Sequence, residues 1–60
     1  MAFVISGVSS SLAVAHARMT PVSALMKAKE LEDEGYFDIQ IEDIDRVFTP
    51  EEFQREYKTG

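Results

Sequence analysis

Residues 20–35 read TPVSALMKAKELEDEG, and this stretch decides the fold. We predict a helix here because both of its ends are marked. Thr20 is a suitable N-cap, Pro21 suits the first helical position, and Gly35 suits the left-handed conformation that ends a helix. Apolar residues recur at spacings of three and four, namely Ala24, Leu25, Ala28 and Leu31, and we expect Val22 to lie beside them. The helix therefore presents an apolar face that the rest of the chain must cover.

Acidic side chains crowd the end of this predicted helix. Glu32, Asp33 and Glu34 lie in its last turn, where the helix dipole favours cations rather than anions. Lys29 has the spacing for an ion pair with Asp33, worth a few tenths of a kcal/mol. The acidic turn is either a contact for a partner or a solvated surface, and both interpretations stay open at this point.

Two apolar segments precede the helix, and we predict that they form a hairpin. Residues 2–5 suit a strand, the Gly/Ser-rich residues 7–11 suit a turn, and residues 12–19 suit a second strand. A helix over residues 12–19 competes with this interpretation because alanine is a poor strand former. In a strand, alternate side chains share a face: Leu12, Val14 and His16 on one side, and Ala13, Ala15 and Ala17 on the other.

The segment after the helix contains the clearest strand pattern in the chain. Phe37, Ile39 and Ile41 alternate with polar residues, as in a strand with one buried and one solvated face. Residues 43–45 suit a turn, and residues 46–48 are a candidate fourth strand.

A second, shorter helix is predicted over residues 50–57. Thr49 and Glu52 have the spacing of a capping box, in which each side chain accepts a hydrogen bond from the other residue's backbone N–H. Phe48 and Phe53 have the spacing of a hydrophobic staple around the same helix start.

The element order β-β-α-β-(β)-α predicts a small α+β fold. We expect a mainly antiparallel sheet of three or four strands, with the long helix packed on one face and a short C-terminal helix. Residues 1–60 are expected to form a single domain, in which residues 58–60 are frayed.

The chain resembles small uncharacterised bacterial proteins over nearly its whole length. In those proteins a helix ends in Gly followed by an aromatic residue, a strand follows, and an Arg-Val-Phe-Ser/Thr-Pro-Glu-Glu-Phe segment closes the chain. The corresponding segments here are residues 24–31, 35–41 and 46–53. The resemblance implies a bacterial source and a family without an assigned function, and it carries over no functional residue.

Composition limits how so short a chain can be stabilised. Sixty residues allow only a small core, which usually needs help from disulfides, metal or self-association. The absence of cysteine excludes disulfides and thiolate metal sites, and a single histidine excludes a multi-histidine zinc site within one chain. Self-association is the remaining route.

The net charge of −5 is distributed unevenly along the chain. Residues 1–29 carry three bases and no acid, a charge of +3, whereas residues 30–60 carry eleven acids and three bases, a charge of −8. The overall charge disfavours nucleic acid as a partner, because such binding depends on neutralising phosphates. The acidic half predicts a candidate surface for a protein partner, formed by Glu32, Asp33, Glu34, Asp43 and Asp45.

No motif points to catalysis, to a cofactor or to a metal. Residues 41–52 have the length of a calcium loop, but Ile41 would occupy its first ligand position and Arg46 the position that requires Gly. His16 is better interpreted as a half-buried structural residue than as a base or a ligand. The glycines are isolated, and no serine has a recognisable His and acid partner. We therefore expect a protein that is not an enzyme.

The N-terminal segment is apolar enough to raise the question of a targeting sequence. Ala15-His16-Ala17 fits a signal-peptide cleavage pattern, but no Lys or Arg precedes Arg18 and residues 7–11 interrupt the apolar run. No run approaches the roughly 18 apolar residues of a membrane span. We expect a cytoplasmic protein without membrane contact.

Two functions remain after these exclusions. The first is a non-enzymatic protein-interaction module that self-associates through the sheet face away from the helix, where small residues gather: Ala2, Val4, Ala13, Ala15 and Ala17. The second is an acidic regulator or inhibitor that binds a basic protein partner.

Overall fold

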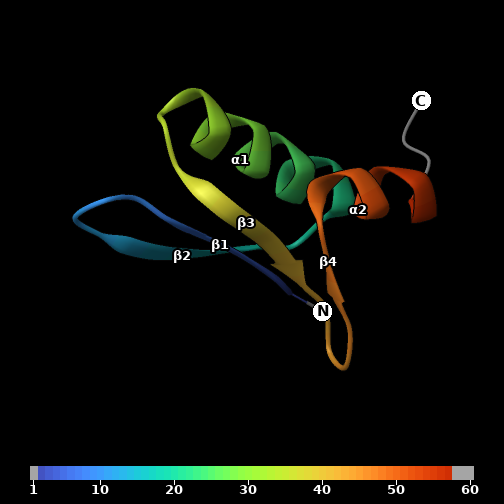
Figure 1. Cartoon of the computed structure of the whole chain (residues 1–60). Coiled ribbons are helices and arrows are strands. Elements are labelled where there is room, and N and C mark those ends of the chain that lie inside the picture. Colours follow the sequence, from blue (N-terminus) through green and yellow to red (C-terminus); the bar gives the residue numbers. More distant parts are fainter. Residues whose placement is uncertain (1, 58–60) are drawn as a thin grey trace.

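The computed structural model describes residues 2–57 and confirms a small α+β fold with the element order β-β-α-β-β-α. One antiparallel sheet has the strand order β2-β1-β3-β4. Helix α1 packs on one face of this sheet, and α2 follows β4 (Figure 1). The bounds are β1 (Phe3–Val8), β2 (Ala13–Arg18), α1 (Pro21–Asp33), β3 (Phe37–Glu42), β4 (Val47–Phe48) and α2 (Pro50–Glu56). The expected fraying of residues 58–60 lies outside the described residues.

Helix α1 begins and ends where its sequence signals predict. The Thr20 hydroxyl oxygen accepts a hydrogen bond from the Ser23 N–H at 3.2 Å, as an N-cap does. At the other end Gly35 has φ +94°, and the Tyr36 N–H donates to the Leu31 carbonyl at 3.0 Å. The left-handed residue therefore turns the chain from α1 directly into β3.

Replacing Gly35 with alanine is expected to destabilise the domain by about 1–2 kcal/mol, the usual cost of a left-handed conformation for an L-residue with a Cβ. A Cβ at this position meets nothing within 4 Å, so the cost comes from the backbone alone. Urea unfolding of the Gly35→Ala and Gly35→Asn variants measures it, because asparagine tolerates this conformation better than alanine. Equal stability of Gly35→Ala and the wild type would contradict this explanation.

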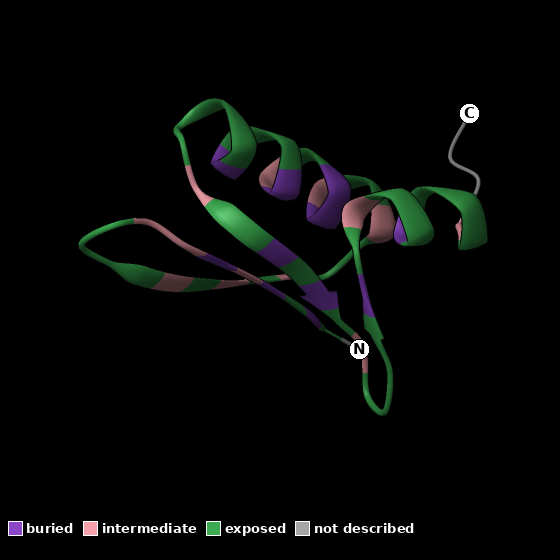
Figure 2. Ribbon diagram, viewed as in Figure 1, coloured by how far each residue is buried: buried purple, intermediate pink, exposed green. Residues whose placement is uncertain are grey.

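The side of α1 that faces the sheet is apolar, as predicted, with one exception. Ala24, Leu25, Ala28 and Leu31 are buried, and Figure 2 shows the buried positions of α1 on its sheet side. Val22 was expected beside them but is 51% exposed. A helix turns about 100° per residue, which places Val22 well outside the arc occupied by the four buried residues.

The sheet side of the core comes from the strands, and α2 closes one end of it. Phe3 and Ile5 of β1, Ile39 and Ile41 of β3, and Phe48 of β4 are buried beneath the helices. Phe53 of α2 is fully buried, with ring centroids 5.4 Å from Phe3, 5.5 Å from Phe48 and 4.5 Å from Tyr57. The predicted staple between Phe48 and Phe53 is thus part of a larger aromatic cluster.

The predicted capping box is present at the start of α2. The Thr49 hydroxyl accepts from the Glu52 N–H at 3.1 Å, and the Glu52 carboxylate accepts from the Thr49 N–H at 3.0 Å. Pro50 occupies the first helical position. These local contacts direct the chain from β4 into α2 and so place Phe53 over the core.

The hairpin is confirmed, but its turn lies further along the chain than predicted. Strand β1 continues to Val8 and the connection is residues 9–12, whereas the prediction ended the strand at Ile5 and placed the turn at residues 7–11. Gly7 is a buried strand residue over which other side chains pack closely, not a turn residue. The Ser9 hydroxyl accepts from the Leu12 N–H at 3.1 Å and holds the actual turn.

Candidate functional site

The face of the sheet opposite α1 has no helix over it within residues 2–57. Side chains alternate along a strand, and paired residues share a face, so the register identifies every side chain on this side. We call this surface the open face; it consists of Val4, Ser6, Val8, Ala13, Ala15, Ala17, Phe37, Gln40, Glu42 and Val47. Among the residues predicted for it, Val4 and the three alanines lie there, and Ala2 is exposed just before β1.

Phe37 belongs to the open face, although the alternation predicted that it would be buried with Ile39 and Ile41. Its side chain is 55% exposed, and Phe37 pairs with Val8 across an irregularity in the β1–β3 ladder. Asp38 has φ +52° at that point, which is unusual for a residue other than glycine. The irregularity is a β-bulge that adds one residue to β3 and so moves Phe37 to the other face.

Apolar and charged side chains share the row of the open face that crosses all four strands. Val4 pairs with Ala17 on one side and with Glu42 on the other, and Glu42 pairs with Val47. Val47 is 55% exposed and Val4 is 37% exposed. A carboxylate therefore lies between two exposed valines at one end of this surface.

Strand β2 is the long edge of the sheet, and no residue along it is buried (Figure 2). The Ser9 N–H donates to the Leu12 carbonyl at 2.7 Å, so Ser9 and Leu12 form a hydrogen-bonded pair. Hydrogen-bonded and non-hydrogen-bonded pairs alternate along an antiparallel ladder, so this first pair determines which of the following β1–β2 pairs are hydrogen-bonded. Even-numbered residues of β2 bond to β1. Odd-numbered residues turn N–H and C=O outward: Ala13, Ala15 and Ala17.

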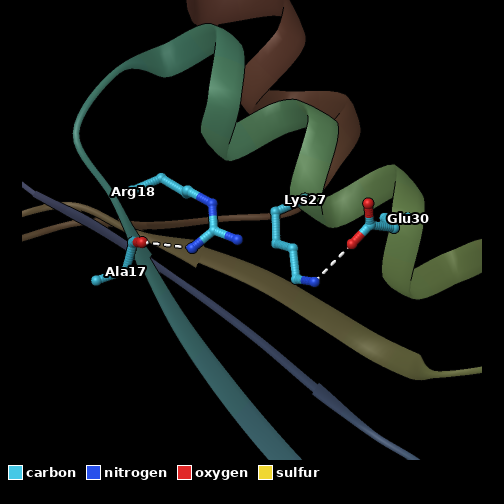
Figure 3. Close-up of polar contacts among 4 residues, drawn as sticks. All are labelled: Ala17, Arg18, Lys27 and Glu30. Atoms are coloured by element: carbon cyan, nitrogen blue, oxygen red, sulfur yellow. Dashed lines mark hydrogen bonds and ion pairs between the residues drawn. The ribbon is translucent and has the colours of Figure 1, made fainter.

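Arg18 partly covers this edge. Its guanidinium Nη1 donates to the Ala17 carbonyl at 2.7 Å, as Figure 3 shows. This bond agrees with an Ala17 carbonyl that points away from β1. Apart from Arg18, β2 carries none of the devices that usually protect an edge within the described residues, since it contains no proline, no lysine and no bulge.

A groove of about 160 Å³ lies beside α1 near the end of β2. Its lining residues are Arg18, Ser23, Met26, Lys27 and Glu30. The Lys27 ammonium contacts the Glu30 carboxylate at 2.6 Å (Figure 3). The hydrogen bond from Lys27, and next its positive charge, lower the pKa of Glu30 below the ordinary value of 4.5. The predicted pair between Lys29 and Asp33 is absent from the described ion pairs, so Lys27 and Glu30 supply the link along α1.

Glu30→Gln is expected to flatten the acid side of the stability profile. The folded pKa of Glu30 is lowered, so its contribution is present above the unfolded value of 4.5 and is lost as the pH falls through the folded value. The effect is small because Glu30 is exposed and screened by water. Urea midpoints measured on both sides of pH 4.5 check this. An identical fall in midpoint for the wild type and Glu30→Gln would contradict it.

The five predicted partner-contact acids do not form one surface. Glu32, Asp33 and Glu34 are exposed at the end of α1, whereas Asp43 and Asp45 lie in the β3–β4 turn (Figure 1). Strand β3 separates the two groups by six residues, or about 20 Å at about 3.3 Å per residue. A single small partner surface therefore cannot contact all five at short range.

Asp43 has a structural role in the turn where it lies. Its carboxylate accepts from the Ile44 N–H at 2.7 Å and from the Tyr57 hydroxyl at 3.1 Å. Burial, and then this hydrogen bond to Asp43, raise the pKa of the Tyr57 phenol. The bond ties the β3–β4 turn to the end of α2 and leaves Asp43 less available to a partner than Asp45.

Another hollow lies between β4 and α2. Its volume is about 300 Å³, and it is lined by Arg46, Val47, Phe48, Glu52, Arg55 and Glu56. One of its two arginines already has partners within the chain. The Arg46 guanidinium lies 4.6 Å from the centre of the Phe48 ring and 3.9 Å from the Glu56 carboxylate. Within residues 2–57 no three His, Asp or Glu side chains are grouped as metal ligands.

Neither helix within residues 2–57 is long and apolar enough to cross a membrane. Comparison of the chain with protein-family models, with curated proteins and with solved structures found no match. The open face and the β2 edge therefore stand as the candidate functional surface on their own geometry.

Proposed function

We propose that this protein is a non-enzymatic interaction module that self-associates through its sheet. One observation carries the proposal: within residues 2–57 the four-stranded sheet is covered on one face only, and its long edge strand is unpaired on the outer side. Unpaired strand edges and exposed apolar sheet surface are the features through which sheets recruit further chains.

The composition of the uncovered surface supports this proposal. Phe37 and Val47 are more than half exposed, and the neighbouring alanines leave the backbone of β2 accessible. Val47 and Val4 flank Glu42 at one end of the open face, and Phe37 lies beside Val8 at the other end, so exposed apolar side chains occur along the whole length of this surface. The small core, with ten buried apolar side chains in the described range, also leaves a domain of this length with stability to gain from association.

The alternative, an acidic regulator of a basic partner, has weaker support from the geometry. Its five acids fall into two groups at opposite ends of β3, so the partner would need two separate basic surfaces. Such binding would weaken steeply with salt, because solvent-exposed charges are screened beyond about 8–10 Å at ionic strengths near physiological. Self-association through a sheet depends much less on salt.

Light scattering on the purified full chain tests the proposal. The mass is expected to rise from the 6.8 kDa of one chain toward twice that value as the concentration reaches the high micromolar range, and to persist in 0.5–1 M salt, where exposed ion pairs are screened within about 3–5 Å. A mass that stays at one chain at every concentration would refute self-association.

A further inference from the structure

We infer that the partner at the β2 edge is a second copy of this chain, whose own β2 pairs antiparallel with the first and places Ala15 of one copy opposite Ala15 of the other. The two four-stranded sheets then form one continuous eight-stranded sheet, with both α1 helices on the same face. This inference rests on the proposed function, since it specifies how the self-association takes place.

The free backbone groups of β2 match this arrangement. Ala13, Ala15 and Ala17 each turn one N–H and one C=O outward, by the ladder alternation that the Ser9–Leu12 bond sets. In a two-fold pairing centred on Ala15, Ala15 faces its equivalent and Ala13 faces Ala17. Every outward group between residues 13 and 17 then gains a partner, which makes six hydrogen bonds across the interface. The Ala17 carbonyl accepts from Arg18 in the single chain, so Arg18 turns aside or shares that oxygen when the strands pair.

Other registers satisfy fewer groups. Two residues opposite each other in one sheet must share a face, so the pairing is centred on a residue, such as Val14, Ala15 or His16, and not between two residues. Centring on Val14 pairs Ala13 with Ala15 and leaves Ala17 without a partner in β2. Centring on His16 leaves only the groups of Ala15 and Ala17 paired within β2 and sets two identical imidazoles side by side. Centring on Ala15 instead places His16 opposite Val14 on the helix-facing side.

The charge distribution favours identical chains meeting at β2. The chain has a net charge of −5, so two copies repel unless they meet where carboxylates are absent, and residues 1–29, which include β1 and β2, contain no acid. The two Arg18 side chains lie six residues apart along the paired strands, or about 20 Å, beyond the screening length of about 8–10 Å.

Stacking of two open faces is disfavoured by the same kind of argument. Glu42 lies between Val4 and Val47 on that face, and stacking would bury its carboxylate against the second copy. A buried carboxylate without a cation partner costs several kcal/mol, and the open face supplies no Lys or Arg. Edge pairing leaves Glu42 in water.

The size of the interface sets the concentration at which association appears. At the usual density of about one hydrogen bond per 100–200 Å², six bonds correspond to roughly 600–1,200 Å² of buried surface. That is at the lower limit for a specific interface and is typical of weak or transient dimers. The dimer must therefore be measured at protein concentrations up to about the millimolar range.

Three substitutions distinguish edge pairing from other modes. Ala15→Lys places two like charges directly opposite each other in the dimer but in solvent in the monomer. Ala15→Pro removes only an outward N–H, a change that an edge strand tolerates. Gln40→Lys is the matched control. Gln40 of β3 and Ala15 of β2 both pair with Ser6 of β1, so the two residues lie on the open face in one row, but Gln40 is away from the β2 edge.

Sedimentation equilibrium of the full-length wild type and the three variants is the test, with circular dichroism to establish that each variant folds. We expect Ala15→Lys and Ala15→Pro to raise the dissociation constant of the dimer about tenfold or more, and Gln40→Lys to change it less than about threefold. If Ala15→Pro does not fold, the comparison of the dissociation constants of Ala15→Lys and Gln40→Lys distinguishes edge pairing from the other modes.

Each other outcome overturns the inference in a recognisable way. Equal weakening by the two lysine variants, with Ala15→Pro unchanged, would mean that the open faces stack. A dimer unaffected by any variant would place the interface elsewhere, and the proposed function would stand without this edge. A wild type that is monomeric at all concentrations would remove both the inference and the proposed function.

Discussion

Phe53→Ala is expected to destabilise the domain by about 3–5 kcal/mol, the usual cost of removing a buried aromatic side chain. Phe53 is fully buried and contacts Phe3 and Phe48 edge-on and Tyr57 at a tilt, so its loss leaves a cavity bordered by three rings. Small domains are stable by only about 5–15 kcal/mol, with short chains at the lower end. We therefore expect a largely unfolded chain near 37 °C.

Phe37→Ala is the matched control for this prediction. It removes the same side chain from the open face, where Phe37 is 55% exposed, and its expected effect on folding is under about 1 kcal/mol. Thermal unfolding by circular dichroism compares the two variants at low protein concentration, where association does not contribute. Similar losses at the two positions would show that α2 does not close the core as described.

Gly7→Ala is expected to cost about 1–3 kcal/mol, because a well-packed core has no room for an added methyl group. A Cβ on Gly7 would lie 3.3 Å from the Ile39 side chain and 3.3 Å from the Tyr36 Cβ. The Tyr36 Cβ is fixed to the backbone just after α1 and cannot move aside by a rotamer change. The loss should exceed the gain of about 0.5–1 kcal/mol that alanine normally brings over glycine in a strand.

Ser6→Ala provides the comparison in the same strand. Ser6 lies on the open face, on the side of the sheet away from the core, so the change is expected to alter stability by less than about 0.5 kcal/mol. Urea midpoints of the two variants separate packing from strand propensity. A Gly7→Ala variant as stable as the wild type would mean that α1 and β3 can move away from β1 without loss.

The parts of the fold that could be predicted are those with local signals. Thr20 and Gly35 mark α1, and Thr49 with Glu52 marks α2, because caps are satisfied by residues close in the chain. The alternation in residues 12–19 predicted correctly which alanines share a face, since side-chain direction in a strand depends only on parity. These signals were sufficient for the fold class.

What could not be predicted depends on contacts distant in the chain. Gly7 has the appearance of a turn residue, and only the packing of Tyr36 and Ile39 against it shows why a strand needs glycine there. Phe37 lies on the open face because of a bulge opposite Gly7, and no local pattern indicates a bulge. The candidate surface was therefore predicted in its alanines but not in Phe37 or Val47, its most exposed apolar residues.

Amide hydrogen exchange of Ala13, Ala15 and Ala17 tests the central claim most directly, since these are the N–H groups that β2 turns away from its neighbour. In dilute solution they should exchange rapidly, while Val14 and His16, which bond to β1, are protected. At concentrations where the mass doubles, the account predicts slower exchange at the three alanines. Equally rapid exchange at these three amides in dilute and concentrated solution would contradict it.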